Sequence, residues 1–296
     1  MDRYVSDLQS RDDGFNFKLY RYVPSLPAAI IFVVIFATLT ALHTWRLYRS
    51  RALYFTAFTI GGLFETIGYC GRIWSHYDNQ AIGGFVMQAI LILVAPALFA
   101  ASVYMILGRL IRAIRAEHLS LLPVRRLTTI FVVGDVISFT LQAAGGGIQS
   151  AGTLNMFNIG EKIIVVGLCM QIAFFGFFVV TVILFYQRIR AHPTPEAQQN
   201  EIPWRRHVRV LFAVSIIILV RSVVRVVEYL QGNDGYLIAH EIFLYIFDAT
   251  LMVAVMTILL VYYVSDLKIA LDRIKATSSP LRSDYLMDTV RGGDGS

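Results

Sequence analysis

Long runs of apolar residues, separated by short polar links, extend along most of this chain. Residues 79–108, 136–160 and 163–187 contain no charged side chain. Each run exceeds the roughly 20 residues that an α-helix needs to cross the hydrocarbon core of a bilayer. The pattern predicts seven membrane-spanning helices, at residues 24–45, 53–74, 82–107, 127–149, 161–186, 208–229 and 237–264. We therefore expect an all-α integral membrane protein with seven transmembrane helices.

Composition supports a membrane protein and argues against a nucleic-acid-binding one. Of the 296 residues, 56% are hydrophobic and 16% are charged, whereas soluble domains carry about 25% charged residues. The net charge of +6 comes from basic residues beside the apolar runs, so we expect membrane lipids and no nucleic acid as partners. Cys70 and Cys169 both lie within predicted helices, which favours packing over a disulfide framework.

The basic residues are distributed unevenly between the links. The links after the first, third and fifth predicted helices, together with the C-terminal tail, hold seventeen Lys and Arg residues, whereas the links after the second, fourth and sixth hold none. Cytoplasmic loops carry such an excess. The pattern predicts an extracellular N-terminus and a cytoplasmic C-terminus. The link at 191–203 is polar and proline-rich, so we expect it to be flexible.

This orientation divides the chain into three parts. Residues 1–23 are predicted to form an extracellular tail, and residues 24–264 the seven-helix transmembrane domain. Residues 265–296 are predicted to form a cytoplasmic region, with a basic juxtamembrane helix near 265–275 and a disordered tail after it.

Three of the predicted helices are interrupted by polar residues at one repeated spacing. The second, sixth and seventh helices each carry a trio at positions i, i+4 and i+7, which places the three side chains on one helix face. The trios are Glu65, Tyr69 and Arg72; Arg221, Arg225 and Glu228; and Glu241, Tyr245 and Asp248, with His240 adjacent. With the predicted orientation, all three trios lie in the outer half of the membrane.

Charged side chains that face lipid are costly, since one charge at the centre of a membrane helix costs roughly 2.5–3.5 kcal/mol by the lower estimates. We therefore expect the trios to face one another around an outward-facing polar pocket. The simpler alternative is pairing alone, for example of Arg72 with Glu228 and of Glu65 with an arginine. The trios hold four carboxylates against three arginines. One acid is thus left to carry a proton, to contact His240 or to bind a cation such as a lipid amine.

Few other polar residues fall within the predicted helices. Asp135 and Gln142 share a face of the fourth helix, so they either extend a polar path towards the cytoplasm or form a single bond between helices. His43 lies at the cytoplasmic end of the first helix and is expected at the interface. Pro96 is expected to kink the third helix.

The sequence contains no motif that would indicate an enzyme. A Gly-x-Ser-x-Gly elbow, a phosphate-binding glycine loop with its lysine and a Cys-x-x-Cys pair are all absent. A membrane zinc hydrolase would need three or more converging ligands. The one set available is weak, comprising His76 and His240 with Glu241 or Asp248. We therefore expect no catalytic residue, no metal and no cofactor.

Several segments, taken in order, resemble a known family. They are Tyr22-Val-Pro-Ser-Leu26, Gly61-Gly-Leu-Phe-Glu-Thr-Ile-Gly-Tyr-Cys-Gly-Arg72, Ala95-Pro-Ala-Leu-Phe-Ala-Ala-Ser-Val-Tyr-Met-Ile-Leu-Gly-Arg109, Gly134-Asp-Val-Ile-Ser-Phe-Thr-Leu-Gln-Ala-Ala-Gly-Gly-Gly147 and Arg221-Ser-Val-Val-Arg-Val-Val-Glu-Tyr-Leu-Gln-Gly-Asn-Asp-Gly235. Together they are similar to the fungal RTA-like family, also called the lipid-translocating exporter family, over roughly residues 20–265.

The resemblance implies a seven-span protein, usually of the fungal plasma membrane. Members of that family are linked to resistance to toxic lipids and sterol analogues, to transport of sphingoid long-chain bases and, in one branch, to porphyrin uptake. The leading hypothesis is a non-enzymatic lipid transporter or translocase for sphingoid-base-like, sterol-like or porphyrin-like amphiphiles. The alternatives are a seven-helix receptor or sensor for a lipid-like ligand and an intramembrane metal-dependent lipid hydrolase. The sequence does not predict the oligomeric state.

Overall fold

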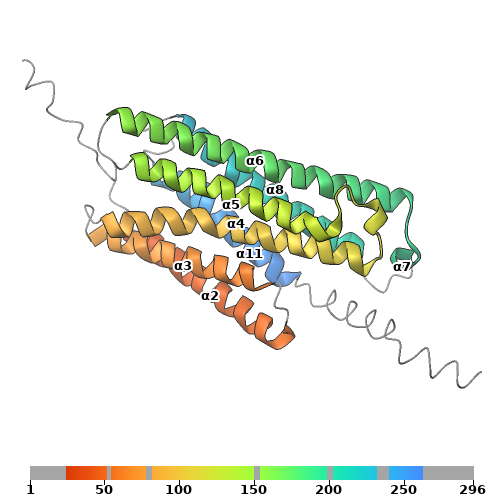
Figure 1. Cartoon of the computed structure of the whole chain (residues 1–296). Coiled ribbons are helices and arrows are strands. Elements are labelled where there is room, and N and C mark those ends of the chain that lie inside the picture. Colours follow the sequence, from red (N-terminus) through yellow and green to blue (C-terminus); the bar gives the residue numbers. More distant parts are fainter. Residues whose placement is uncertain are drawn as a thin grey trace, which may run out of the picture.

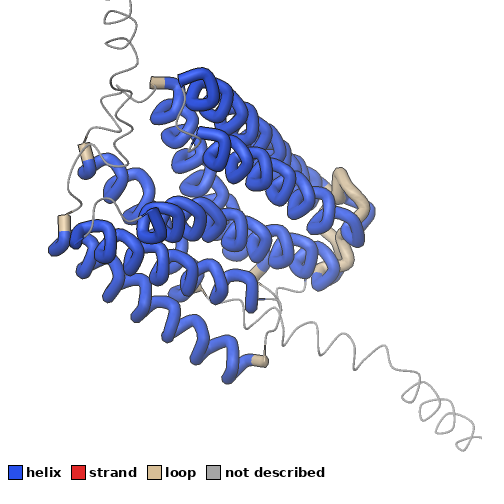
Figure 2. The backbone as a smooth tube through the Cα atoms, turned by 60° about the vertical axis from the view of Figure 1, so that its left-hand side comes forward, coloured by secondary structure: helices blue, strands red, loops and turns tan. Residues whose placement is uncertain are grey.

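The computed structural model describes six stretches of the chain, namely residues 25–51, 55–77, 82–149, 154–198, 203–231 and 240–262. The predicted extracellular tail (1–23) and the predicted cytoplasmic helix and tail (265–296) lie outside the described residues. The regular structure in the described stretches is entirely helical, and they contain no strand (Figure 2). The all-α class is therefore confirmed for this part of the chain.

Seven long helical segments of the described chain form one bundle (Figure 1). The first six are α2 (Leu26–Ser50), α3 (Thr56–Tyr77), α4 (Ile82–Ala113), α5 (Val124–Gln149), α6 (Leu154–Ala191) and α8 (Trp204–Leu230). The seventh segment runs through α10 (Glu241–Leu244), the π-helical turn η3 (Tyr245–Thr250) and α11 (Leu251–Val261). Consecutive segments run in opposite directions, and α11 packs against both α8 and α2, which closes the bundle.

Six of these segments, all except α3, are long and apolar enough to cross a membrane. The chain is therefore an integral, multi-pass membrane protein. The predicted bounds 82–107 and 161–186 were too narrow as helix bounds, because α4 has 32 residues and α6 has 38. The hydrogen bonds of a helix do not depend on apolar surroundings, so a helix of about 50 Å continues past the apolar run that marks the bilayer core.

α3 turns its polar residues inward and its apolar residues outward. Glu65 and Arg72 are buried in the bundle, whereas Ile60 and Leu63 are exposed on its outer surface. A surface helix of a soluble protein has the reverse arrangement. This arrangement suits a helix whose outer surroundings are lipid.

Glycines bring neighbouring helices close together. A Cβ atom added at Gly68 of α3 would lie 2.7 Å from Cγ1 of Ile92 in α4. A Cβ atom added at Gly145 of α5 would lie 2.7 Å from the carbonyl oxygen of Gly160 in α6. Small residues at such positions allow the van der Waals contact that holds membrane helices together.

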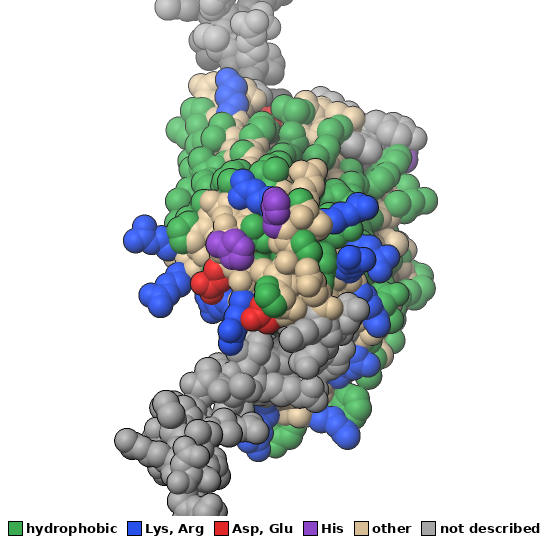
Figure 3. Space-filling model, turned by 90° about the vertical axis from the view of Figure 1, so that its right-hand side faces the viewer, with side chains coloured by type: hydrophobic (Ala, Val, Ile, Leu, Met, Phe, Trp, Pro, Cys, Tyr) green, Lys and Arg blue, Asp and Glu red, His purple; other side chains and the backbone are tan. Residues whose placement is uncertain are grey.

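The end of the bundle at which α4 and α6 finish is basic. Lys and Arg side chains gather around it in a view along this end (Figure 3). Between the long helices here lie the short turns η2 (Glu117–Leu119) and α7 (Pro195–Gln198). The polar trios lie towards the opposite end, near the C-termini of α3 and α8.

The link at 191–203 is packed in its described part. The Thr194 hydroxyl donates to the Ile114 carbonyl at 2.8 Å, and the Trp204 indole N–H donates to the Ala197 carbonyl at 3.1 Å. Thr194, Ala197 and Trp204 are all buried. The described part of the link, 191–198, is therefore anchored to Ile114, just after α4, and to α8, by contacts that composition alone does not reveal.

Candidate functional site

The side chains of the three trios meet between α3, α8 and the seventh segment. Arg72 contacts Glu241 at 2.8 Å. One turn further into the bundle, the ring centroids of Tyr69 and Tyr245 lie 6.3 Å apart. Because α3 and the seventh segment run in opposite directions, another turn brings Glu65 to the depth of Asp248. The trios therefore converge, and their contacts divide them into two clusters.

The Glu241 cluster consists of Ser25, Arg72, Glu241 and Tyr245. Oε1 of Glu241 accepts hydrogen bonds from Arg72 Nη2 at 2.8 Å, from the Tyr245 hydroxyl at 2.9 Å and from the Ser25 backbone N–H at 2.9 Å. Ser25 directly precedes α2, and the N–H groups at a helix start lack internal partners and favour a negative charge. Glu241 thus ties α2, α3 and the seventh segment together.

The pairing of Arg72 with Glu228 predicted by the simpler alternative is wrong. The antiparallel register of α3 and the seventh segment sets Arg72 opposite Glu241 instead. The Arg72 guanidinium also lies 5.2 Å from the centroid of the Tyr245 ring, a cation–π contact that adds to the ion pair.

The Asp248 cluster consists of Arg221, Arg225, Glu228 and Asp248. Asp248 pairs with Arg221 through Oδ1 and accepts from Arg225 Nη2 through Oδ2 at 3.0 Å. Arg225 Nη1 donates to Oε2 of Glu228 at 3.2 Å. The Arg221 and Asp248 side chains are 3% and 5% exposed, whereas those of Arg225 and Glu228 are 16% and 21% exposed. The cluster is therefore buried at one end and open at the other.

Arg221 has a further partner that sequence reasoning missed. Its Nη2 donates to the backbone carbonyl of Ile92 at 3.0 Å. Ile92 lies four residues before Pro96, and proline has no N–H with which to bond that carbonyl. Pro96 therefore leaves the Ile92 carbonyl of α4 without its helical hydrogen bond. The guanidinium group of Arg221, from α8, donates to this carbonyl instead.

The π-helical turn was also missed. It spans Tyr245–Thr250, and the Thr250 hydroxyl donates to the Tyr245 carbonyl at 2.9 Å. The turn contains two of the trio residues, Tyr245 and Asp248. The sequence Tyr-Ile-Phe-Asp-Ala-Thr contains no proline or glycine that would have predicted this turn. Such single turns occur frequently at functional sites.

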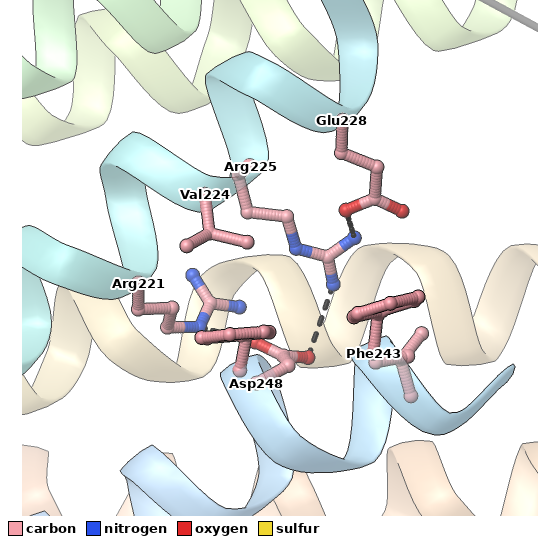
Figure 4. Close-up of a pocket in the computed structure, with 8 residues that line it drawn as sticks. Arg221, Val224, Arg225, Glu228, Phe243 and Asp248 are labelled. Carbon is pink, nitrogen blue, oxygen red and sulfur yellow. Dashed lines mark hydrogen bonds and ion pairs between the residues drawn. The ribbon is translucent and has the colours of Figure 1, made fainter. Parts of the chain in front are cut away.

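A cleft opens beside the Asp248 cluster, between α8 and the α10–η3 part of the seventh segment (Figure 4). Arg221, Arg225 and Glu228 line it from α8, and Asp248 lines it from η3. The other lining residues are apolar: Val224, Phe243, Leu244 and Phe247. The cleft is shallow, with an enclosed volume of about 10 Å³, which is the space of roughly one water molecule. Its wall combines charged and apolar side chains.

Phe243 and Phe247 are cleft residues that the sequence analysis did not identify. Their rings stack with centroids 6.3 Å apart and planes 11° from parallel. The spacing i, i+4 places them on one helix face, which is the signal that was available. His240, predicted as part of the site, is exposed immediately before α10, with its ring edge-on to Phe243.

Glu65 and Tyr69 lie deeper than the cleft. Glu65 is 1% exposed, and neither of its carboxyl oxygens has a hydrogen-bond partner among the described residues. The Tyr69 hydroxyl is likewise buried without a hydrogen-bond partner in the described chain. The expected hydrogen-bonded pairing of Glu65 with an arginine is thus absent, because Arg221 and Arg225 both turn to Asp248.

The other intramembrane polar residues turn to separate neighbours. Asp135 accepts a hydrogen bond from the Tyr104 hydroxyl of α4 at 2.9 Å, and the Gln142 amide donates to Gln171 of α6 at 3.1 Å. These contacts match the alternative of single bonds between helices. His43 is fully buried, with Nε2 3.0 Å from the Met256 carbonyl, so its ring faces the interior of the bundle.

The residues proposed for a zinc site do not form one in the described structure. Among the described residues, no group of three or more His, Cys, Asp or Glu side chains is placed to hold a metal ion. Glu241 and Asp248 are instead engaged by the arginines described above. The described geometry therefore gives no support to the hydrolase alternative.

Comparison with known proteins gives consistent matches. Residues 58–268 match the family described as RTA1 like protein. Over 284 residues the chain is 37% identical to protoporphyrin uptake protein 1 of Saccharomyces cerevisiae, an alignment that covers 84% of this chain and 92% of that protein. It is 35% identical to protein RTA1 of the same yeast over 276 residues, covering 85% and 86% of the two chains.

A more distant relative is the sphingoid long-chain base transporter RSB1 of Saccharomyces cerevisiae. It is 27% identical over 275 residues, covering 81% of this chain and 72% of that protein. No solved structure matches the chain. The order of motifs, the family match and the yeast relatives agree, and the chain belongs to the RTA1-like family of fungal membrane proteins.

Proposed function

We propose that this protein moves amphipathic lipids, and cationic sphingoid-base-like lipids in particular, between the leaflets of a fungal plasma membrane or out of it. The observation that carries the proposal is the cleft beside the Asp248 cluster. It combines charged side chains with the apolar surface of Phe243, Leu244 and Phe247 inside a membrane-spanning bundle. A lipid with a charged head and a hydrocarbon chain presents the same combination.

The contacts in the cleft suggest how a lipid amine would bind. Arg225 bridges Glu228 and Asp248 with two different nitrogens. An ammonium group that replaces Arg225 at Glu228 leaves the bond between Arg225 and Asp248 in place. Glu228 is the more exposed of the two acids, so it is the proposed head-group contact, and the chain of the lipid lies along Phe243 and Phe247.

The same cleft offers arginines to an anionic amphiphile. Relatives of this chain are named for protoporphyrin uptake and for sphingoid-base transport, which are ligands with opposite head-group charges. A cleft with both signs of charge accommodates either class. Removal of toxic amphiphiles by this route would give the resistance that the family resemblance implies.

The proposed topology has seven spans, an extracellular N-terminus and a cytoplasmic C-terminus. Six of the spans are the long apolar helices, and α3, second along the chain, completes the seven, since it packs against α2 and α4 with its polar face inward. The basic end seen in Figure 3 then faces the cytoplasm, and the cleft lies in the outer half of the membrane. We propose no catalytic role for any residue.

Proteoliposomes that contain only this protein test the proposal. We expect them to move a fluorescent sphinganine between leaflets faster than protein-free liposomes do. Phe247→Ala should slow this flux because it removes cleft surface, whereas Phe212→Ala should not, because Phe212 is exposed on α8 outside the cleft. A wild-type flux equal to that of empty liposomes would refute transport. Saturable binding of the probe without flux would support the receptor alternative instead.

A further inference from the structure

Glu65 is a buried acid that the proposed cleft chemistry leaves without a role. It lies on the inward face of α3 at 1% exposure, and neither carboxyl oxygen has a hydrogen-bond partner in the described chain. One turn away, the buried Tyr69 hydroxyl is in the same situation. A buried polar group without a partner is destabilising, and a charged one is more so. Such a group therefore needs an explanation.

The charge balance around Glu65 supplies one. All three trio arginines contact other acids: Arg72 contacts Glu241, and Arg221 and Arg225 contact Asp248. Asp248 and the two arginines of α8 lie close enough to interact electrostatically with Glu65. A fourth negative charge at this depth would be repelled by Asp248 and would have no direct counterion. A proton on Glu65 removes both penalties.

The remaining neighbours do not supply a counterion. Tyr69 and Arg72 lie on the same helix, and Arg72 is engaged at Glu241. Tyr245 faces Tyr69 from η3 and donates to Glu241 as well. From α4 the nearest group in the network is the Ile92 carbonyl, which Arg221 occupies.

Glu65 is connected to the cleft through the arginines that it faces. Arg221, Arg225 and Asp248 line the cleft, whereas Glu65 is buried and does not line it. A negative charge on Glu65 competes with Asp248 for a guanidinium group, and a neutral Glu65 does not. The protonation state of Glu65 therefore alters which acids the arginines hold at the cleft surface.

We propose that Glu65 is a proton-binding site and that the protein exchanges protons for cationic amphiphiles. This inference rests on the proposed function. When the Glu65 O–H bond breaks, its proton passes to water, and the carboxylate draws Arg225 inward from Glu228. The freed Glu228 carboxylate then accepts the ammonium head of the lipid. When Glu65 takes up a proton from water, Arg225 returns to Glu228 and displaces the head group. Each cycle thus moves one proton in one direction and one lipid cation in the other.

A permanently charged probe separates this exchange from passive amine movement. N,N,N-trimethylsphingosine carries a quaternary head that cannot itself bind a proton. With proteoliposomes that hold a pH-sensitive dye, we expect addition of this probe outside to make the wild-type lumen more alkaline as protons leave. Glu65→Gln should lose the proton signal and should move the probe more slowly than the wild type, because its neutral amide leaves Arg225 at Glu228. Glu117→Gln, an acid-to-amide change at an exposed residue of η2, should behave as wild type.

Several outcomes would overturn the proposal. Probe movement by the wild type without proton movement would do so, as would a proton signal from Glu65→Gln equal to that of the wild type. Glu65→Asp, which keeps an acid, should retain the proton signal. Loss of the proton signal in Glu65→Asp as well as in Glu65→Gln, with both variants folded, would also contradict the mechanism. Elution as a single monodisperse peak identifies the folded variants.

A second measurement does not depend on transport. Infrared spectra of the protein in lipid should show the carbonyl band of a protonated carboxylic acid in the wild type and in Glu117→Gln, and this band should diminish in Glu65→Gln. If no variant moves lipid but the band changes as expected, the proposed function fails while the proton site stands. Identical bands in the wild type and Glu65→Gln would refute the proton site.

Discussion

Glu241 and Asp248 lie seven residues apart on one helical segment and both pair with arginine, yet their clusters differ in what surrounds them. In the Glu241 cluster the acid meets an arginine, a tyrosine and the start of a helix, and the Arg72 side chain is 0% exposed. In the Asp248 cluster the chain of contacts ends at Glu228, which is 21% exposed beside an apolar cleft.

This difference separates two uses of charge inside a membrane. Glu241 joins three helices, so its contacts serve the assembly of the bundle. Among the described residues Glu228 pairs only with Arg225, three residues earlier on the same helix, so this bond joins no separate elements. An acid whose bond is not needed for assembly is available to exchange partners. The acids and arginines balance in both clusters, one of each around Glu241 and two of each around Asp248, so the contacts and not the net charge distinguish them.

The largest expected effect comes from breaking the Glu241 cluster. Arg72→Met leaves the partly buried Glu241 carboxylate, which is 16% exposed, without its counterion. Breaking one side of a buried pair typically costs about 3–5 kcal/mol, and the partial exposure of Glu241 places the expected cost at the lower end of that range. We expect a loss of this size in the free energy of unfolding of the purified protein in mixed micelles, because no other arginine contacts Glu241 in the described structure.

A double variant shows whether the cost comes from the orphaned charge. Arg72→Met combined with Glu241→Leu removes both charges, and replacing a buried pair by apolar residues is often nearly neutral. We expect most of the lost stability to return, apart from about 0.5–2 kcal/mol for the cap at the start of α2. A double variant as unstable as Arg72→Met alone would contradict a structural role for the pair.

A smaller effect on the free energy of unfolding is expected from Gly145→Ala, a substitution that alters helix packing and no charge. In Gly145→Ala the new Cβ atom would lie 2.7 Å from the Gly160 carbonyl, whereas nothing lies within 4 Å of a Cβ atom at Gly147. Overpacking of this kind costs about 1–3 kcal/mol. We expect Gly145→Ala to lower the unfolding free energy by that amount and Gly147→Ala to leave it unchanged. Flux per folded molecule should be the same in both, which separates general loosening from loss of the cleft. Equal stability of the two variants would show that the α5–α6 contact is not tight.

Much of the fold follows from the sequence because the bilayer imposes simple rules. Apolar runs longer than the bilayer core identify the long helices, and the spacing i, i+4, i+7 shows which faces turn inward. The polar face of α3 illustrates this, since Glu65, Tyr69 and Arg72 are all buried. The packed link at 191–198 was not predicted, because its stability rests on single bonds such as that from Thr194 to Ile114.

The contacts within the site are less predictable than its membership. Which arginine meets which acid depends on the register between α3 and the seventh segment, and no residue pattern sets that register. The π-helical turn at Tyr245–Thr250 has no sequence signal either. The bond from Arg221 to the Ile92 carbonyl, in contrast, has a sequence signal, because Pro96 predicts a free carbonyl four residues earlier. A search for such carbonyls would have named Ile92 as an acceptor.

The smallest expected change in stability accompanies a large change in function. Glu228→Gln removes one partner of a partly exposed pair, which is worth at most about 1 kcal/mol, and Arg225 keeps its bond to Asp248. If Glu228 binds the lipid amine, loss of that charge should raise the sphinganine concentration for half-maximal flux roughly tenfold, as expected for about 1.4 kcal/mol of binding free energy. Glu117→Gln serves as the matched control. Unchanged concentration dependence in Glu228→Gln would move the head-group site elsewhere, whereas a large loss of stability would place Glu228 with Glu241 among the residues that hold the bundle together.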